Sequence, residues 1–299
     1  MPDLSTVSIV EFPVDAEGPY GIAVGADGAV WFTYVHDGRI GRLAGNGQHT
    51  SYRLETPSGR PSIITAGPDG ALWFTESHAD RIGRISTDGA ITGFAVPTAD
   101  AGPFGITEGP DGALWFTEPH ADRIGRISTD GAITEFPLPG SGTFPTMITA
   151  GCDGALWFTL NQADAIGRIT TDGRVDIHPL PTSGAGPVGI TAGGDGALWF
   201  VEIVAGQLGR ITVDGAITEL PLPDREGRPH AITSAADGSC WFTEWGTNRV
   251  GRVGADGHIT EYALPDRFSE PHGIAAGRDG ALWVALESGA IARVDDPPV

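Results

Sequence analysis

The sequence predicts an all-β fold, a seven-bladed β-propeller with four-stranded blades, because two residue types recur at one interval and the two chain ends complement each other. Seven tryptophans lie 42 residues apart, at Trp31, Trp73, Trp115, Trp157, Trp199, Trp241 and Trp283. Seven prolines keep the same interval, at Pro19, Pro61, Pro103, Pro145, Pro187, Pro229 and Pro271. A repeat of this length with short strands and turns is typical of propellers, in which each repeat forms one blade.

The third repeat shows the expected order of strands within a blade. Gly105–Thr107 is predicted as the innermost strand, Ala113–Glu118 as the second, Arg123–Ser128 as the third and Ile133–Leu138 as the outer strand. Asp-Gly turns follow the first and third strands, and this dipeptide between β-branched or aromatic runs is a strong hairpin signal because it tolerates positive φ. The signal recurs in almost every repeat. No helical stretch or change of composition marks a second domain, which predicts one domain over residues 1–299.

The two ends of the chain predict that the ring is closed. The seventh repeat stops after Ile291–Val294 and lacks an outer strand. Near the N-terminus, Val10–Val14 (VEFPV) resembles the outer strand segment Thr134–Leu138 (TEFPL). We therefore expect Val10–Val14 to complete the seventh blade, which would remove the unpaired edges of an open sheet.

The composition narrows the range of partners. All 18 basic residues are arginine and face 38 acidic residues, which gives a net charge of −20. This balance disfavours nucleic acid and anionic membranes, which require neutralising cations, and the absence of lysine excludes Schiff-base chemistry on a lysine. Met1–Gly18 has no basic start and no apolar run, so we expect no signal peptide or membrane span. We expect a cytoplasmic monomer, with Cys152 and Cys240 as unpaired thiols.

The residue after each recurrent proline opens an innermost strand and is expected to surround the mouth of the central channel. The loop after each second strand returns to the same face, so two sets of loops line one mouth. The residues after the prolines are Tyr20, Ser62, Phe104, Thr146, Val188, His230 and His272. In a closed ring Tyr20, His272 and His230 are neighbours, which gathers polar and ionisable side chains on one side of the mouth.

The seventh repeat departs most from the others. It alone has an acid before its proline, Glu270, and an acid at the fourth position after its tryptophan, Glu287. Both are expected at the same mouth as His272. Each of these residues alone could be a solvated surface residue, but together they suit a hard divalent cation with a base beside it. Mg²⁺ is typically held by one or two protein carboxylates and keeps positions for water and substrate, so we expect Mg²⁺ at Glu270 and Glu287.

Other candidate residues have simpler explanations. Four acids share one repeat position and are expected to have a common structural role: Glu76, Glu118, Glu202 and Glu244. Histidines in equivalent loops are expected to be solvated rim residues: His36, His78 and His120. Trp245, the one tryptophan outside the series, either stacks on a substrate ring or packs against a neighbouring blade. The chain lacks Gly-x-Ser-x-Gly and Cys-x-x-Cys, the usual signals of serine hydrolases and zinc sites.

The sequence resembles the virginiamycin B lyases, also called streptogramin lyases, over its whole length. The resemblance is carried by Gly18-Pro19-Tyr20-Gly21-Ile22, Arg228-Pro229-His230, Glu270-Pro271-His272-Gly273-Ile274 and Ala285-Leu286-Glu287. It implies a Mg²⁺-dependent enzyme that linearises type B streptogramins, small cyclic depsipeptide antibiotics, by breaking their ester without water. It also implies that Glu270 and Glu287 hold Mg²⁺, that His272 is the catalytic base, and that substrate lies against three further residues: Tyr20, His230 and Trp245.

The implied chemistry is a β-elimination. The ester oxygen sits on Cβ of a threonyl residue, so removal of the Cα proton allows the carboxylate to leave. The developing carbanion needs a polarised carbonyl, a task for a Lewis acid, and a neutral His272 could take the proton. Two alternatives remain from the sequence. One is a metal-dependent lactone hydrolase on the same fold, and the other is a non-catalytic propeller that binds a ligand at its mouth.

Overall fold

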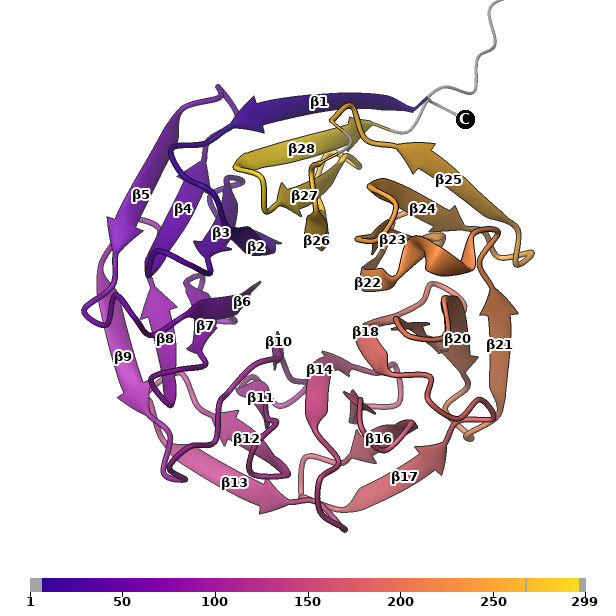
Figure 1. Cartoon of the computed structure of the whole chain (residues 1–299). Helices are drawn as coiled ribbons and strands as arrows, with labels where there is room; N and C mark the ends of the chain where they lie inside the picture. Colours follow the sequence, from indigo (N-terminus) through magenta and orange to yellow (C-terminus); the bar gives the residue numbers. More distant parts are fainter. Residues whose placement is uncertain (1–6, 267, 296–299) are drawn as a thin grey trace, which may run out of the picture.

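The computed structural model describes residues 7–266 and 268–295, which form seven four-stranded antiparallel sheets arranged radially in one ring (Figure 1). The innermost strands lie around the centre of the ring, and the outer strands form its circumference. The predicted all-β, seven-bladed propeller is therefore confirmed. The extreme ends of the predicted domain, residues 1–6 and 296–299, lie outside the described part of the chain.

The blades are numbered here in chain order. Blade 1 contains β2 (Pro19–Val24), β3 (Val30–Tyr34), β4 (Arg39–Leu43) and β5 (His49–Arg53). Blade 2 contains β6 (Pro61–Ala66), β7 (Leu72–Glu76), β8 (Arg81–Ile85) and β9 (Ile91–Ala95). Blade 3 contains β10 (Ile106–Glu108), β11 (Leu114–Glu118), β12 (Arg123–Ile127) and β13 (Ile133–Pro137). Blade 4 contains β14 (Pro145–Ala150), β15 (Leu156–Leu160), β16 (Ala165–Ile169) and β17 (Val175–Pro179).

The remaining blades follow the same order. Blade 5 contains β18 (Pro187–Ala192), β19 (Leu198–Glu202), β20 (Gln207–Ile211) and β21 (Ile217–Pro221). A short 3₁₀ helix, η1 (Arg225–Gly227), precedes blade 6, which contains β22 (Pro229–Ser234), β23 (Cys240–Glu244), β24 (Arg249–Val253) and β25 (Ile259–Ala263). Blade 7 contains β26 (Pro271–Ala276), β27 (Leu282–Leu286), β28 (Ala290–Asp295) and, as its outer strand, β1 (Ser8–Pro13).

The ring is closed by the N-terminal strand, as the sequence predicts. β1 pairs antiparallel with β28, in a register that runs from Ser8 opposite Asp295 to Pro13 opposite Ala290. The strand begins two residues before the predicted Val10 and ends one before Val14, whose backbone N–H still donates to the carbonyl of Gly289 at 3.0 Å. Both ends of the described chain are thus paired in blade 7, which leaves no open sheet between blades 1 and 7.

The 42-residue period follows from one set of contacts that most blades repeat. In blade 2, Trp73 is fully buried and its indole N–H donates to Oδ1 of Asp69 at 3.0 Å. The second oxygen of Asp69 accepts from Nε of Arg84 at 2.6 Å, and the guanidinium lies 5.9 Å from the centre of the Trp73 ring. At Gly83, a Cβ would lie 2.1 Å from the Phe74 ring, so only glycine fits there. Blades 1 to 6 therefore keep Trp, turn Asp, Gly and Arg at fixed spacing, whereas blade 7 pairs Ala292 with Val284 in place of the Gly–Phe pair.

Threonine hydroxyls join neighbouring blades beside the mouth. On the second strand of five blades, a threonine Oγ1 donates to the carbonyl of the residue after the next blade's proline, at 2.7 or 2.8 Å: Thr33, Thr75, Thr117, Thr159 and Thr243. We call these bonds threonine clasps. Val201 and Ala285 occupy the equivalent positions of blades 5 and 7. The clasp of Thr243 holds the backbone of His272, so this seam contact also bears on the site described below.

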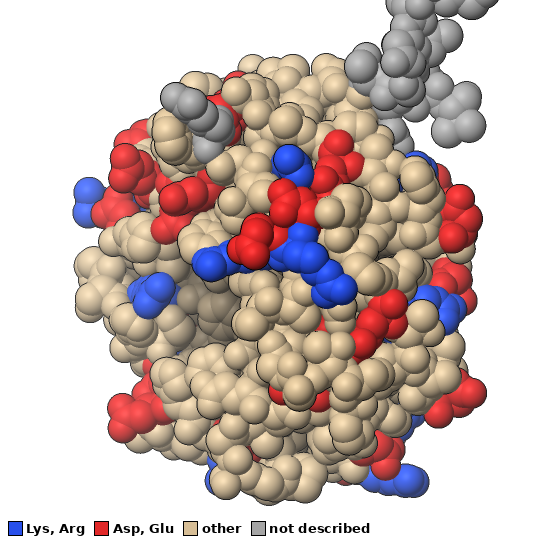
Figure 2. Space-filling view, turned by 45° about the vertical axis from the view of Figure 1, so that its right-hand side comes forward, with Lys and Arg blue, Asp and Glu red and all other residues tan. Residues whose placement is uncertain are grey.

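The surface agrees with the strongly acidic composition. Figure 2 shows acidic side chains spread over the face that it presents, with a band of mixed charge beside a hollow. Among the described residues no helix has the length and apolar character needed to cross a membrane. Cys152 and Cys240 are both unpaired, as predicted.

Candidate active site

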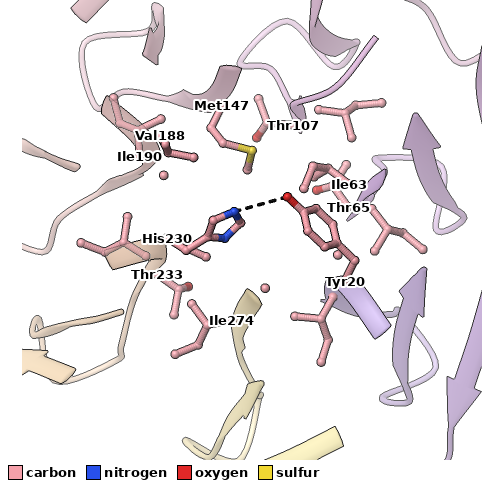
Figure 3. A pocket seen from close by; sticks show the side chains of 18 of the residues that line it. Tyr20, Ile63, Thr65, Thr107, Met147, Val188, Ile190, His230, Thr233 and Ile274 are labelled. Carbon is pink, nitrogen blue, oxygen red and sulfur yellow. Dashed lines mark hydrogen bonds between the residues drawn. The ribbon is translucent and has the colours of Figure 1, made fainter. Parts of the chain in front are cut away.

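Three aromatic side chains, one each from blades 1, 6 and 7, meet at the mouth of the channel. Tyr20, His230 and His272 are the second residues of β2, β22 and β26, each directly after the recurrent proline that begins the strand. The ring centre of His272 lies 4.6 Å from that of Tyr20 and 4.8 Å from that of His230. A hydrogen bond of 3.3 Å joins the Tyr20 hydroxyl to Nε2 of His230 (Figure 3). The predicted neighbours are therefore in contact.

A backbone irregularity directs these side chains toward the mouth. In blade 7 the register between β26 and β27 shifts between Pro271 and Ile274, and equivalent shifts occur after Pro19 and Pro229. Such bulges turn side chains out of the regular alternation of a strand. Glu270, which precedes Pro271, has a left-handed φ of 49°, rare for a residue with a side chain. Its backbone N–H donates to Oδ1 of Asn248 at 2.9 Å, which helps to hold this conformation.

The carboxylate of Glu287 lies between His272 of blade 7 and His36 of blade 1, the two blades that meet where the ring closes. Oε2 makes an ion-pair contact with Nε2 of His272, and Oε1 lies 2.6 Å from Nε2 of His36 in blade 1. The contact with His272, supported by that with His36, lowers the pKa of Glu287 to about 2 although burial acts in the opposite direction. Glu287 is therefore an anion at physiological pH.

Tyr20 and His230 form a neutral pair beside this charged group. Burial, followed by the nearby His272, lowers the pKa of His230 to about 3. Burial, followed by the charge of Glu287, raises the pKa of the Tyr20 hydroxyl. Both side chains are thus uncharged at physiological pH and suited to hydrogen bonding. His272 differs because its Nε2 contacts the carboxylate of Glu287.

The two acids of the seventh repeat line one hollow. It has a volume of about 290 Å³, and its walls include Glu270, Glu287 and His36. The backbones of the two acids are joined, because the N–H of Glu287 donates to the carbonyl of Glu270 at 3.1 Å. Among the described residues no cluster of three or more potential ligands forms a ready-made metal site. An ionised Glu287 with Glu270 in the same hollow fits a hard cation such as Mg²⁺, which takes few protein ligands.

Trp245 stands at the edge of this group. Its ring centre lies 6.5 Å from that of His272, and the guanidinium of Arg228 lies 5.5 Å from the centre of the Trp245 ring. Trp245 is therefore close enough to contact a molecule that touches His272. The cation on its face indicates that the ring is also held by a neighbouring side chain of blade 6.

Inside the ring, the channel forms a cavity of about 230 Å³ into which Tyr20 and His230 project (Figure 3). Most of its wall is apolar and includes Ile63, Met147 and Ile190. This lining explains the desolvation of Tyr20 and His230. The neutral pair thus separates an apolar channel from the charged group at His272 and Glu287.

The structure brings together most of the residues that the sequence singles out, and it adds one. Tyr20, His230, His272 and Glu287 form one connected group, and Glu270 shares a hollow with Glu287. His36 was expected to be only a solvated rim residue, yet its half-exposed ring contacts Glu287. Ring closure would have indicated this contact, because the His36 loop of blade 1 lies at the same mouth as blade 7. Because blades 2 and 3 also have a histidine at this position, His36 did not differ from the repeat and was not selected as a site residue.

The four acids that share a repeat position end their strands in buried surroundings, in keeping with a common structural role. Three of them bond to nearby side chains: Glu76 to Thr56, Glu202 to Gln207 and Glu244 to Thr247. The fourth, Glu118, is fully buried, and neither of its carboxyl oxygens has a hydrogen-bond partner among the described residues. Burial, with the nearby charge of Glu135, raises the pKa of Glu118 to about 8.

Comparison with known proteins identifies relatives along the whole chain. The family model described as the Virginiamycin B lyase family matches residues 7–294. Virginiamycin B lyase of Saccharopolyspora erythraea is 62% identical over 48 residues, which are 16% of this chain and 16% of that protein. The enzyme of the same name from Bordetella parapertussis is 46% identical over 64 residues, 21% of each chain. The matched segments thus span no more than 21% of the length of these two curated relatives.

Solved structures extend the similarity to nearly the full length. A streptogramin B lyase structure has a TM-score of 0.94 and 45% identity, and the alignment covers 97% of this chain and 98% of that chain. A catalytically inactive histidine-to-alanine variant of virginiamycin B lyase from Staphylococcus aureus, solved with quinupristin, has a TM-score of 0.93 and 44% identity, with 97% and 99% covered. A putative gluconolactonase, at 18% identity and a TM-score of 0.63, covers 97% of this chain and 92% of its own and shares the fold alone.

Proposed function

Because the chain belongs to the virginiamycin B lyase family, we propose that it inactivates type B streptogramins, cyclic depsipeptide antibiotics, by opening their ester bond without adding water. The observation that carries this proposal is the Glu287 carboxylate between His272 and His36, beside the neutral pair of Tyr20 and His230. This arrangement supplies a base with a stabilising anion and, separately, uncharged groups that can bind substrate oxygens. A relative at 44% identity was solved with quinupristin, which supports the substrate class.

His272 is the proposed base of a β-elimination. It takes the Cα proton of the threonyl residue whose Cβ carries the ester oxygen. The electrons of the C–H bond form the Cα–Cβ double bond, and the C–O bond to Cβ breaks, which releases the carboxylate. Glu287 stabilises the imidazolium formed on His272, because opposite charges in contact attract strongly in a partly buried site. A catalytically inactive histidine-to-alanine variant of a relative supports the participation of a histidine in the reaction.

Glu270 and Glu287 are the residues that would hold Mg²⁺, whose chemistry there would be Lewis-acid polarisation of a substrate carbonyl. Tyr20 and His230 orient the substrate through hydrogen bonds, since the low pKa of His230 and the raised pKa of Tyr20 make both neutral. Trp245 offers a flat face to the macrocycle. In this assignment one histidine moves a proton and the other positions substrate.

Turnover of quinupristin in the presence of Mg²⁺ tests the proposal. We expect the cyclic antibiotic to disappear in proportion to enzyme concentration, as followed by liquid chromatography and mass spectrometry. The matched control is His272→Ala at equal concentration, with folding verified by circular dichroism. Binding without any turnover by the folded, Mg²⁺-supplied protein would instead favour a ligand-binding propeller.

A further inference from the structure

Two hollows lie beside the proposed active site and share lining residues with each other and with the hollow that contains Glu287. The first, about 350 Å³, is walled by Val204 from the β19–β20 loop and by Arg228 and Trp245. The second, about 380 Å³, shares Arg228 and Trp245 with the first and adds Phe268 and Glu270. Phe268 and Glu270 also line the hollow that contains Glu287. We call the first two hollows the lateral trough, which leads from the rim of blade 5 to the residues proposed to react.

The lateral trough is bordered by apolar side chains that the fold leaves in water. Four large apolar residues of the described chain are strongly exposed: Val10, Val204, Val213 and Phe268. Val204, at 73% exposure, and Phe268, at 68%, are the two most exposed, and both wall the trough. Exposed apolar side chains that gather at one place on a surface mark a binding site more often than scattered ones do.

Trp245 lines the hollow of each exposed residue and also lies near His272. It walls both hollows of the trough, and its ring centre is 6.5 Å from that of His272. The guanidinium of Arg228 over the Trp245 ring adds a flat cation to the same wall. The trough is also lined by charged groups, namely Arg225, Glu226 and Glu270. The part of its wall suited to an apolar or aromatic side chain is the part formed by Val204, Trp245 and Phe268.

We propose that the lateral trough is a binding subsite for an apolar side chain of the cyclic depsipeptide, and that Val204 and Phe268 are specificity-determining residues. This inference rests on the proposed function and adds residues that do not take part in the chemistry. The occupant follows from continuity, because a macrocycle with its ester at His272 extends past Trp245 into the trough. Apolar contacts of this kind strengthen binding of substrate and transition state equally, so they change KM more than kcat.

The test replaces the two exposed residues and uses a matched control from the same blade as Val204. Val204→Ser and Phe268→Ser should each raise KM for quinupristin, by about 5-fold and about 10-fold or more respectively, because each loses apolar area buried by the ligand. Val213→Ser is the control, since Val213 is also an exposed valine of blade 5 but lies in the β20–β21 turn, on the opposite face. Its KM should equal that of the unmodified enzyme, and melting temperatures should show that all three variants fold.

The outcomes separate this inference from the function on which it rests. If the unmodified enzyme does not turn over quinupristin, the proposed function fails and the subsite with it. If turnover occurs but Val204→Ser and Phe268→Ser keep the KM of the control, the proposed function stands and the subsite is wrong. A loss that falls on kcat with unchanged KM would also overturn it, because binding contacts remote from the chemistry should not act that way.

Discussion

Thr243 joins blade 6 to the proposed base, so its removal should impair catalysis as well as stability. The hydroxyl of Thr243 donates to the carbonyl of His272 at 2.8 Å and accepts from the N–H of Ala231 at 3.0 Å, and the side chain is fully buried. Thr243→Val keeps the shape of the side chain and removes both bonds. His272 lies in the register shift of β26, where regular ladder pairing is interrupted, so the threonine clasp contributes to its position.

The expected stability loss follows from the two bonds. A buried hydrogen bond contributes about 0.5–1.5 kcal/mol, so losing two should lower the free energy of unfolding by about 1–3 kcal/mol. In a chain of this size that corresponds to a melting temperature lower by about 2–6 °C. Misplacement of a catalytic group by about 1 Å costs on the order of 100-fold in rate, so a smaller shift of His272 should lower kcat by about 3- to 10-fold.

Thr159→Val is the matched control. Thr159 makes the equivalent clasp in blade 4, donating to the carbonyl of Val188 at 2.7 Å and accepting from the N–H of Met147 at 3.1 Å. It should lose as much stability as Thr243→Val, measured by denaturant unfolding, while its kcat for quinupristin stays unchanged. Equal losses of kcat in the two variants, or none in either, would refute the positional reasoning, and unchanged stability in both would refute the energetic reasoning.

Three further predictions concern single side chains. His272→Ala should lower turnover by roughly 10²- to 10⁴-fold, which is the usual contribution of a general base. His230→Ala should act more mildly and mainly on KM. Steady-state kinetics in which His230→Ala lost more turnover than His272→Ala would contradict the assignment. Glu287→Gln should weaken Mg²⁺ binding in calorimetric titration while the fold is kept, and unchanged affinity would remove Glu287 from the site. Because burial raises the pKa of Glu118 from the ordinary glutamate value of 4.5 to about 8, the folded protein keeps a proton there at pH values where the unfolded chain has released it. Stability should therefore fall as pH rises toward 8, and Glu118→Gln should reduce the change in unfolding free energy between pH 5.5 and 8.5 by up to about 3 kcal/mol; an unaltered pH dependence would contradict the raised pKa.

The fold could be predicted because its main contacts repeat in the sequence. Trp73, Asp69, Gly83 and Arg84 interact through fixed spacing, so the pattern that packs blade 2 is visible in the sequence of blades 1 to 6. The closing strand was predicted from what the seventh repeat lacks. Its bounds differ by one or two residues because β-pairing with β28 extends past the similarity between repeats.

From the sequence, the direction of the chain within each blade predicts which loops lie on the same face of the propeller. The candidate site could be predicted to that extent and no further. That argument gathers Tyr20, His230, His272 and Glu287 at one mouth, and the structure shows them in contact. It does not show which side-chain atoms meet, so the contact of Glu287 with His36 was missed. Side-chain conformation decides such contacts, and residues from opposite ends of the chain meet here only because the ring closes.

The sequence also did not predict the threonine clasps, because it does not show which atoms of neighbouring blades meet. A threonine in a strand is expected from its β-propensity alone, so the recurring position did not indicate a bond between blades. Val201 and Ala285, which replace the threonine in blades 5 and 7, can be recognised as blades without a clasp only when the positions of the neighbouring carbonyls are known. The clasp of Thr243 is one consequence, since it places a structural bond on the backbone of the proposed base.

The mass of the product tests the central claim most directly. Elimination at the threonyl ester yields a linear product with the same mass as the cyclic substrate and a new conjugated double bond, and it takes up no oxygen from solvent. Hydrolysis of the same ester adds one water. We predict that quinupristin incubated with enzyme and Mg²⁺ in ¹⁸O-labelled water gives a linear product of unchanged mass without label. A product heavier by one labelled water would contradict the lyase assignment and establish a lactone hydrolase instead.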